Sequence, residues 1–198
     1  MSLSYDLATV VSRLGARESS PDVSGEDGQA AVAAVLRAPR DHAEAQILLI
    51  RRAQREGDPW SGHMAFPGGK REDVDSSLLV TAQRETKEEV GLDLERHARL
   101  VARLPSMSTM TRAKRGEFLV TPFVFAMENP EHAEFTLSLE VAEAIWVPIG
   151  PMVRGENATT FPYRHEGTLY QLPAFSVHER IVWGLTHRML TMLFSAFS

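Results

Sequence analysis

Three glutamates crowd the end of the segment AFPGGKREDVDSSLLVTAQRETKEEVG, which covers residues 65–91. Glu85, Glu88 and Glu89 are one to four positions apart, and like charges three or four apart on a helix repel each other. A bound divalent cation removes that repulsion, and hard cations prefer carboxylate oxygens as ligands. The spacing therefore favours a divalent-cation site, although a mixed run such as RETKEE is also typical of a solvent-exposed helix face.

The glutamates lie on a helix predicted over residues 76–90. Its apolar face, in which side chains recur at about 100° per residue, is formed by Leu79, Ala82, Thr86 and Val90. The three glutamates span about 100° of the circumference beside that face, and Gly91 is suited to end the helix. The preceding Pro67-Gly68-Gly69 turn permits close backbone approaches that larger residues forbid. The helix and the turn together form the candidate functional segment.

The rest of the chain alternates between apolar runs and turn-rich segments. Paired buried strands are predicted at 29–38 and 45–53, a mostly irregular segment at 54–69, and further strands at 98–107, 116–128 and 143–149. Amphipathic helices are predicted at 4–17 and, with apolar Ile181, Leu185, Met189, Met192 and Leu193, within 178–197. Strands outnumber helices, which indicates an α/β sandwich with a mixed β-sheet. We expect residues 1–28 to form an N-terminal helix and linker, and residues 29–198 to form the main domain.

Composition excludes several classes of protein. The 198 residues include no cysteine, so disulfides, thiolate zinc sites and cysteine nucleophiles are excluded. A formal net charge of −5 argues against a protein that coats nucleic acid. No run approaches the roughly 18 apolar residues of a membrane span, so we expect a cytoplasmic protein that has neither nucleic acid nor a membrane as its partner.

The candidate segment resembles the Nudix box, G-x5-E-x7-R-E-U-x-E-E-x-G-U, in which U is a bulky aliphatic residue. The matching positions are Gly69, Arg84, Glu85, Glu88, Glu89, Gly91 and Leu92. There are three departures, since Asp75 stands at the first glutamate, one extra residue precedes Arg84, and Thr86 replaces the aliphatic residue. None of these changes the three clustered glutamates.

The resemblance implies a Nudix-type α/β/α sandwich that hydrolyses a pyrophosphate bond with Mg²⁺ or Mn²⁺. Glu85 and Glu89 would be the leading metal ligands, and Glu88 would share that role or orient water. The carbonyl oxygen of Gly68 would be a further ligand. Arg84 would act in catalysis by holding the glutamates through charge pairing. The partner would be a small-molecule nucleotide, and because family members often dimerise, a homodimer is also an option.

The flanking sequence LLIRRAQREGDPWSGHMAFPGG resembles the segment that precedes the box in coenzyme A pyrophosphatases. The matches are Leu48, Leu49, Arg52, Gly62 and residues 66–69, and the C-terminal WGLTHRML is also similar to that subfamily. Ile50 and Ala53 replace a threonine and a serine of the pattern, and Arg55 is the nearest counterpart of its second arginine. The resemblance implies that Arg52, Arg55, Phe66 and Gly69 contact the substrate, with coenzyme A or an acyl derivative favoured.

Several alternatives stay open from the sequence. Glu140 or Glu143 would supply a distant carboxylate, or either would be a solvated residue. Other candidates for ligand contact, each with a purely structural alternative, are His63, Trp60, Trp183, Arg112, Lys114 and Arg115. The substrate would alternatively be ADP-ribose, NADH or a nucleoside triphosphate. A non-catalytic nucleotide-sensing module is the alternative from another class, and the intact glutamates argue against it.

Overall fold

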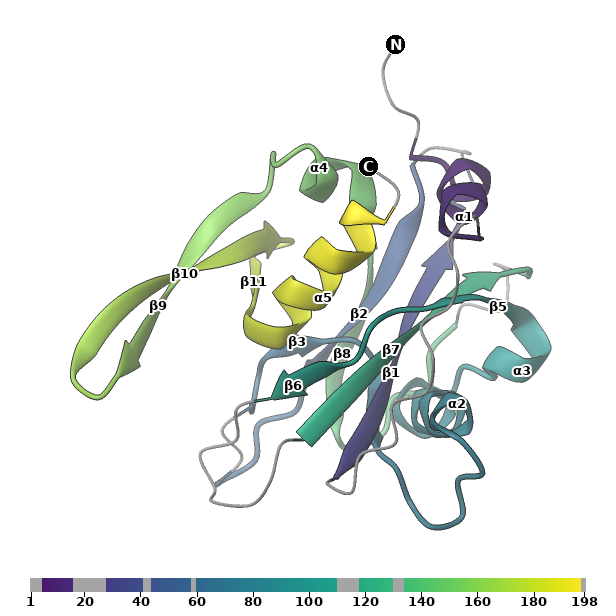
Figure 1. Cartoon of the computed structure of the whole chain (residues 1–198), viewed down its shortest axis with the longest axis horizontal. Helices are drawn as coiled ribbons and strands as arrows, with labels where there is room; N and C mark the ends of the chain where they lie inside the picture. The colour runs from purple at the N-terminus through teal and green to yellow at the C-terminus, as the bar shows by residue number, and fades with distance from the viewer. Residues whose placement is uncertain are drawn as a thin grey trace.

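The computed structural model describes residues 5–15, 28–40, 44–57, 60–109, 118–129 and 134–196 (Figure 1). Its helices are α1 (Leu7–Gly15), α2 (Leu78–Val90), α3 (Leu94–His97), α4 (Ile149–Val153) and α5 (Gly184–Ser195). Its strands are β1 (Gln29–Arg37), β2 (Gln46–Arg52), β3 (Met64–Ala65), β4 (Gly68–Lys70), β5 (Ala98–Arg103), β6 (Met107–Thr109), β7 (Phe118–Met127), β8 (Val141–Pro148), β9 (Ala158–His165), β10 (Thr168–Val177) and β11 (Arg180–Trp183). No helix within these ranges is long and apolar enough to cross a bilayer.

Eight strands of the described residues form one mixed sheet. Its main path runs β3-β2-β1-β7-β5, with β4 and β6 paired to β1 and β7, and β8 paired to β2. The predicted strand pair is confirmed as β1 and β2, which run antiparallel, while β1 and β7 run parallel over most of their length. The parallel pair places β7 beside β1 at the centre of the sheet, where both strands are almost entirely buried.

Helices cover both faces of this sheet (Figure 1). Alternate residues of a strand point to opposite faces, so Val32, Ala34 and Leu36 of β1 pack toward α1 and α5. Ala31, Ala33 and Val35 pack toward α2. The predicted α/β/α sandwich with a mixed β-sheet is therefore confirmed. The catalytic candidates lie on the α2 side.

Helix α2 has well-defined ends. The Ser77 side chain accepts a hydrogen bond from the Val80 backbone N–H, and Gly91 ends the helix in the left-handed conformation at φ 75°. Its buried face differs from the predicted one, because Leu78, Thr81 and Glu89 are buried whereas Leu79 is half-buried. Thr86 is fully buried, and its hydroxyl donates to the Ala82 carbonyl at 2.7 Å, so threonine fits this apolar position.

A second, three-stranded sheet of order β11-β10-β9 was not predicted from the sequence. Tight turns join its strands at Glu166-Gly167 and His178-Glu179, where all four residues have positive φ. The helix predicted within 178–197 is shorter than expected, since residues 180–183 form β11 and α5 begins at Gly184. The β9–β10 hairpin projects away from the body of the molecule (Figure 1).

Candidate active site

A cleft of about 340 Å³ opens beside α2. Its lining residues are Glu72, Arg84, Glu85, Glu88, Glu89, Ser138 and Glu140. Of these seven lining residues in the described part of the chain, five are carboxylates and one is a cation, so the cleft favours a positively charged or metal-bridged ligand. The structure thus brings together the four box residues that the sequence singled out. Glu72 and Ser138 were not predicted, because neither belongs to a recognisable pattern.

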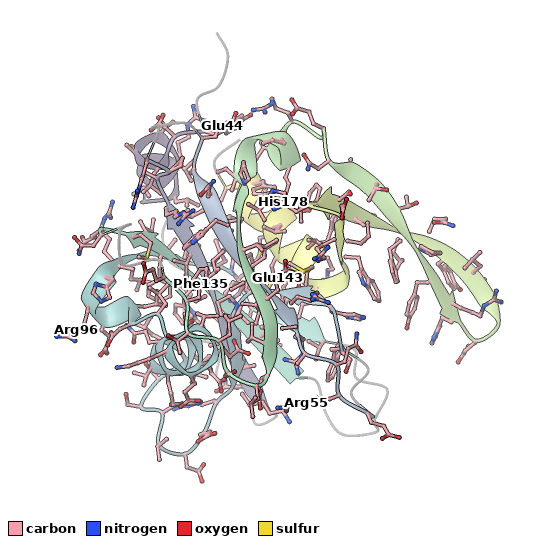
Figure 2. All side chains as sticks on the ribbon, turned by 180° about the vertical axis from the view of Figure 1, so that it is seen from behind. Glu44, Arg55, Arg96, Phe135, Glu143 and His178 are labelled. Carbon is pink, nitrogen blue, oxygen red and sulfur yellow. The ribbon has the colours of Figure 1, made fainter. Side chains whose placement is uncertain are left out.

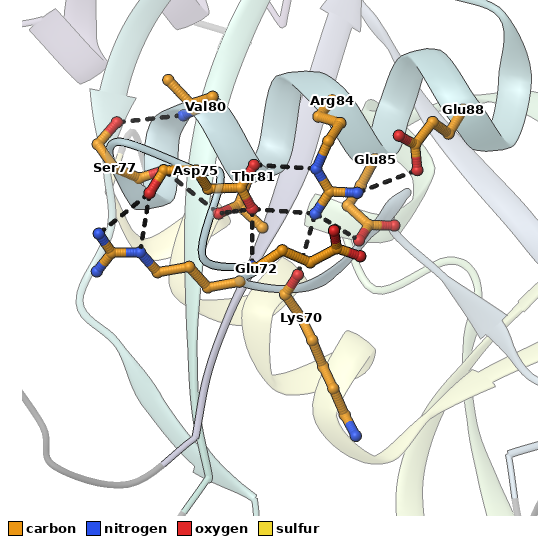
Figure 3. Close-up of polar contacts among 10 residues, drawn as sticks. Lys70, Glu72, Asp75, Ser77, Val80, Thr81, Arg84, Glu85 and Glu88 are labelled. Atoms are coloured by element: carbon orange, nitrogen blue, oxygen red, sulfur yellow. Dashed lines mark hydrogen bonds and ion pairs between the residues drawn. The ribbon is translucent and has the colours of Figure 1, made fainter.

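Arg84 holds this cleft together (Figure 3). Its Nη1 donates to Glu88 Oε2 at 3.0 Å, its Nη2 lies 3.0 Å from Glu85 Oε1, and Nη2 also donates to the Lys70 carbonyl at 3.2 Å. One guanidinium therefore links two glutamates of α2 to the strand β4 in front of them. This geometry fits the positioning role that the resemblance implied for Arg84.

The other side of the Arg84 guanidinium is held by a buried carboxylate. Arg84 Nε and Nη2 donate to the two oxygens of Asp75 at 2.9 and 3.0 Å. Thr81 Oγ1 and the Glu72 backbone N–H donate to Asp75 Oδ2, each at 3.0 Å. The hydrogen bonds between Asp75 and Arg84 hold the pKa of Asp75 below its usual range and raise the pKa of Arg84. Asp75 therefore fixes the position of the Arg84 guanidinium.

Glu89 is the deepest carboxylate of the cleft, with 5% of its surface exposed. Its Oε2 accepts a hydrogen bond from the Gly68 backbone N–H at 2.8 Å. Burial raises the pKa of Glu89 to about 8, a shift that the Gly68 hydrogen bond opposes and the nearby Glu85 charge reinforces. Burial also raises the pKa of Glu85. Ionising both carboxylates therefore costs free energy, and a bound cation would remove that cost.

The Gly68-Gly69 turn fits closely between β1 and α2. A Cβ atom on Gly69 would lie 2.5 Å from the carboxylate carbon of Glu85. At Gly68 a Cβ atom would meet the Ala31 carbonyl of β1, and its φ of 146° is itself unfavourable for other residues. Both glycines are thus required for the glutamates of α2 to lie against this turn.

Arg52 lies on the same face of the sheet as these glutamates. A register shift in the β2–β8 pair, with Ala142 of β8 as the extra residue, places Arg51 opposite Glu143 and Arg52 opposite Val141, whose side chain belongs to the core on the α2 side. The charge of Arg52 is close enough to lower the pKa of Glu89 in part. This placement is compatible with the predicted contact between Arg52 and a substrate.

Phe66 lies in the hydrophobic core rather than on the wall of the cleft. Its side chain is 2% exposed and packs in the core with Met189 and Leu193 of α5. It is not among the residues that line the cleft. The structure gives Phe66 a packing role in the core cluster that includes α5, and its contact with the substrate stays a prediction.

The register of β8 separates the two candidate distant carboxylates. Glu140 precedes β8, lines the cleft, and pairs with Arg55 Nη2 at 3.0 Å. Glu143 lies opposite Arg51 on the other face of the sheet, where its Oε2 accepts from Arg51 Nε and Arg180 Nε at 3.2 and 3.0 Å. Glu140 is therefore the distant carboxylate that faces the α2 glutamates.

The aromatic candidates form a separate group. His63 contacts Trp183 edge-on at 4.9 Å between ring centroids, and Trp183 stacks on Phe161 at 4.1 Å. Trp60 is 52% exposed. None of these rings lines the cleft. Arg112, Lys114 and Arg115 lie outside the described residues.

The cleft residues fit a divalent cation by their chemistry. The donors are all carboxylate oxygens, which suit a hard cation such as Mg²⁺ or Mn²⁺, and Gly69 leaves room for the Glu85 carboxylate where a Cβ atom would displace it. Within the described ranges, no three acidic or histidine side chains are already drawn together as a coordination shell. Arg84 instead pairs with Glu85 and Glu88, and Gly68 pairs with Glu89.

The sequence pattern of the NUDIX domain matches residues 28–165, which is more than two thirds of the chain. The chain belongs to the Nudix family. Several of its relatives are named Nudix hydrolase or diphosphatase, and the chain is accordingly an enzyme of the Nudix pyrophosphohydrolase class. The site beside α2 carries the glutamates of the Nudix box.

Three curated relatives illustrate the similarity. The chain is 29% identical over 166 residues to the uncharacterized Nudix hydrolase NudL of Citrobacter koseri, covering 84% of this chain and 82% of that protein. It is 30% identical over 145 residues to the human mitochondrial coenzyme A diphosphatase NUDT8, covering 71% and 58%. It is 40% identical over 117 residues to the protein C14C4.10c of Schizosaccharomyces pombe, covering 57% of this chain but only 35% of that longer relative.

Solved structures share the fold. The NUDIX hydrolase of Alicyclobacillus acidocaldarius is 20% identical, with a TM-score of 0.55 over 87% of this chain and 93% of that one. The MutT/nudix family protein of Enterococcus faecalis is 18% identical, with a TM-score of 0.54 over 96% and 68%. These likenesses confirm the Nudix-type sandwich.

Proposed function

We propose that this Nudix enzyme hydrolyses the pyrophosphate bond of coenzyme A or an acyl derivative in a reaction that depends on Mg²⁺ or Mn²⁺. The observation that carries the proposal is the cleft in which Glu85, Glu88 and Glu89 face Glu140 around a fixed Arg84. The choice of coenzyme A is supported by the similarity to a human relative named coenzyme A diphosphatase. The products would be 3′,5′-ADP and 4′-phosphopantetheine or its acylated form.

The carboxylates have distinct tasks in this proposal. Glu85 and Glu89 hold the cation, with the Gly68 carbonyl as a further ligand, and Glu88 shares this role or orients the attacking water. When bound, the cation supplies charge stabilisation on the phosphoryl oxygens and the leaving group. The Asp75–Arg84 pair positions Glu85 and Glu88. The partner is a small nucleotide, and a homodimer remains part of the proposal.

Arg52 is the residue that we propose recognises the substrate. It lies at the end of β2 on the face that carries the cleft, beside the deeply buried Glu89. The 3′-phosphate of coenzyme A is an anion that ADP-ribose lacks, and a charge-assisted contact to it contributes about 1.5–3 kcal/mol. That energy corresponds to roughly ten- to a hundredfold discrimination.

A turnover assay with Mg²⁺ tests this proposal on coenzyme A, dephospho-coenzyme A, ADP-ribose, NADH and nucleoside triphosphates. The wild-type enzyme should prefer coenzyme A over dephospho-coenzyme A, and Arg52→Ala should remove most of that preference. Arg51→Ala is the matched control, because Arg51 is the neighbouring arginine on the opposite face and pairs with Glu143. Equal rates on the first two compounds would show that the 3′-phosphate is not read, and faster turnover of ADP-ribose would favour that substrate instead.

A further inference from the structure

Glu140 is shared between the cleft and an ion pair with Arg55. Its carboxylate lines the cleft together with the α2 glutamates, and its Oε1 lies 3.0 Å from Nη2 of Arg55. Both side chains of this pair are about half exposed, at 52% and 48%. The pair therefore stands at the mouth of the cleft, where water, a cation or an anionic ligand can reach both members.

Hydrogen bonds fix the main chain at both Glu140 and Arg55. The Glu140 carbonyl accepts from the Ala53 N–H at 2.8 Å, and the Glu140 N–H donates to Ser138 Oγ at 3.2 Å. The Arg55 N–H donates to Ser61 Oγ at 2.9 Å, and that hydroxyl donates back to the Arg55 carbonyl at 2.8 Å. Only side-chain rotation is needed to separate Arg55 from Glu140, because both main chains are already held.

The charges around the cleft indicate which ligands could replace each member of the Arg55–Glu140 pair. Among the described residues that line the cleft, Arg84 is the one cation, and its guanidinium is bound on both sides by carboxylates. Arg55 lies at the mouth, and the carboxylate of its partner Glu140 lines the same cleft as the α2 glutamates. A divalent cation in the cleft attracts the same Glu140 carboxylate that Arg55 now holds.

We propose that Arg55 and the cleft cation compete for Glu140, so that cation binding releases the Arg55 guanidinium to bind a phosphate group of the substrate at the cleft mouth. This inference rests on the proposed function, because it requires an anionic nucleotide. An exposed ion pair contributes little, so a divalent cation displaces Arg55 easily, whereas a charge-assisted contact to phosphate is stronger. Cation and nucleotide would therefore bind cooperatively through this pair.

The Arg51–Glu143–Arg180 group provides a contrast within the same strands. Glu143 lies three residues after Glu140 but on the opposite face of the sheet, where it is shared by two arginines. Figure 2 shows Arg55 near one end of the β8 ribbon and Glu143 farther along it. Removal of Arg51 takes away the same charge from the same strand region without touching the cleft.

A double-mutant cycle tests the competition directly. Mn²⁺ affinity is measured without nucleotide in the wild type, Arg55→Ala, Glu140→Gln and the double variant, with Arg51→Ala as the control. Arg55→Ala should tighten Mn²⁺ binding about two- to fivefold in the wild-type background and leave it unchanged in the Glu140→Gln background. Arg51→Ala should leave the Mn²⁺ affinity unchanged in both the wild-type and the Glu140→Gln backgrounds.

Binding of 3′,5′-ADP provides the second readout, since this compound has no pyrophosphate to cleave. With Mg²⁺ present, Arg55→Ala should weaken its binding about tenfold, and without Mg²⁺ the loss should be much smaller. If Arg55→Ala tightened Mn²⁺ binding equally in the wild-type and Glu140→Gln backgrounds, the cause would be the general electrostatic field, and the proposed competition for Glu140 would be overturned. Weaker Mn²⁺ binding in Arg55→Ala would overturn it as well. Turnover of coenzyme A by the wild type is scored separately, so a failure of the substrate assignment is distinguishable from a failure of the exchange.

Discussion

Asp75 binds one edge of the Arg84 guanidinium, with Nε and Nη2 donating to its two oxygens at 2.9 and 3.0 Å. Asp75, which stands in place of the first glutamate of the usual Nudix box, thus forms an ion pair with Arg84 (Figure 3). Because Asp75 is buried and also accepts from Thr81, the guanidinium has a fixed orientation. That orientation determines where Glu85 and Glu88 lie.

Arg84→Ala should weaken metal binding and turnover by about ten- to a hundredfold, because residues that orient metal ligands have effects of that size. Raised Mg²⁺ should restore part of the activity, since the glutamates themselves remain. Mg²⁺ titrations of the rate check this, with Arg96→Ala as the control for loss of an exposed arginine. If saturating Mg²⁺ left the defect unchanged, Arg84 would have a different role.

Asp75→Asn should destabilise the fold by about 3 kcal/mol at neutral pH, because it leaves Arg84 without its main buried partner. The pKa of Asp75 is held low in the folded protein, so its contribution is present above about pH 4 and is lost as the pH falls further. Urea unfolding of the wild type should show this acid loss, and Asp75→Asn should show less of it. Equal acid sensitivity in the two proteins would contradict the assignment.

The box residues could be predicted because their spacing on α2 is local. Glu85, Glu88, Glu89 and Arg84 needed only a helix to meet, and the helix ends at Gly91 as expected. Glu72 and Ser138 could not be predicted, because the long-range packing of two loops against α2 brings them into the cleft. The choice between Glu140 and Glu143 depended on the register of β8, which a sequence pattern does not reveal.

The burial of Phe66 and the start of the C-terminal helix could not be predicted from local patterns. Phe66 is adjacent to the functional turn in sequence, yet its large apolar ring gains more from burial against α5 than from solvent contact. Ile181 fits the helical period of the following residues, but pairing with Ser176 places it in β11. The hairpin of β9 and β10 has few apolar residues in regular alternation, so its pairing was not recognised.

Gly69→Ala should lower turnover without unfolding the protein. The new Cβ atom would press on the Glu85 carboxylate, which has to move away from its position beside Arg84. Gly15→Ala is the matched control, because no heavy atom of the described residues lies within 4 Å of the added Cβ atom. Activity and thermal unfolding are measured for both variants, and normal activity in Gly69→Ala would show that the position of Glu85 tolerates this shift.

The stability of the metal-free protein should fall as the pH rises from about 4.5 to about 8. The pKa of Glu89 is raised to about 8, so the folded state binds more protons than the unfolded state across this window. Glu89→Gln should remove most of this slope and be more stable at the upper end, by on the order of a few kcal/mol. Urea unfolding in chelator checks both proteins, and identical slopes would show that Glu89 does not titrate in this window.

The most direct measurement is the rate at which wild type and Glu89→Gln hydrolyse coenzyme A with Mg²⁺, with the products separated and identified. The wild type should release 3′,5′-ADP and 4′-phosphopantetheine and should lose all activity when the cation is chelated. Glu89→Gln should retain its fold and be slower by about a hundredfold or more, because it removes a ligand charge from the cleft. A near-normal rate in Glu89→Gln, or a wild type that leaves coenzyme A intact, would contradict the proposed reaction at this site.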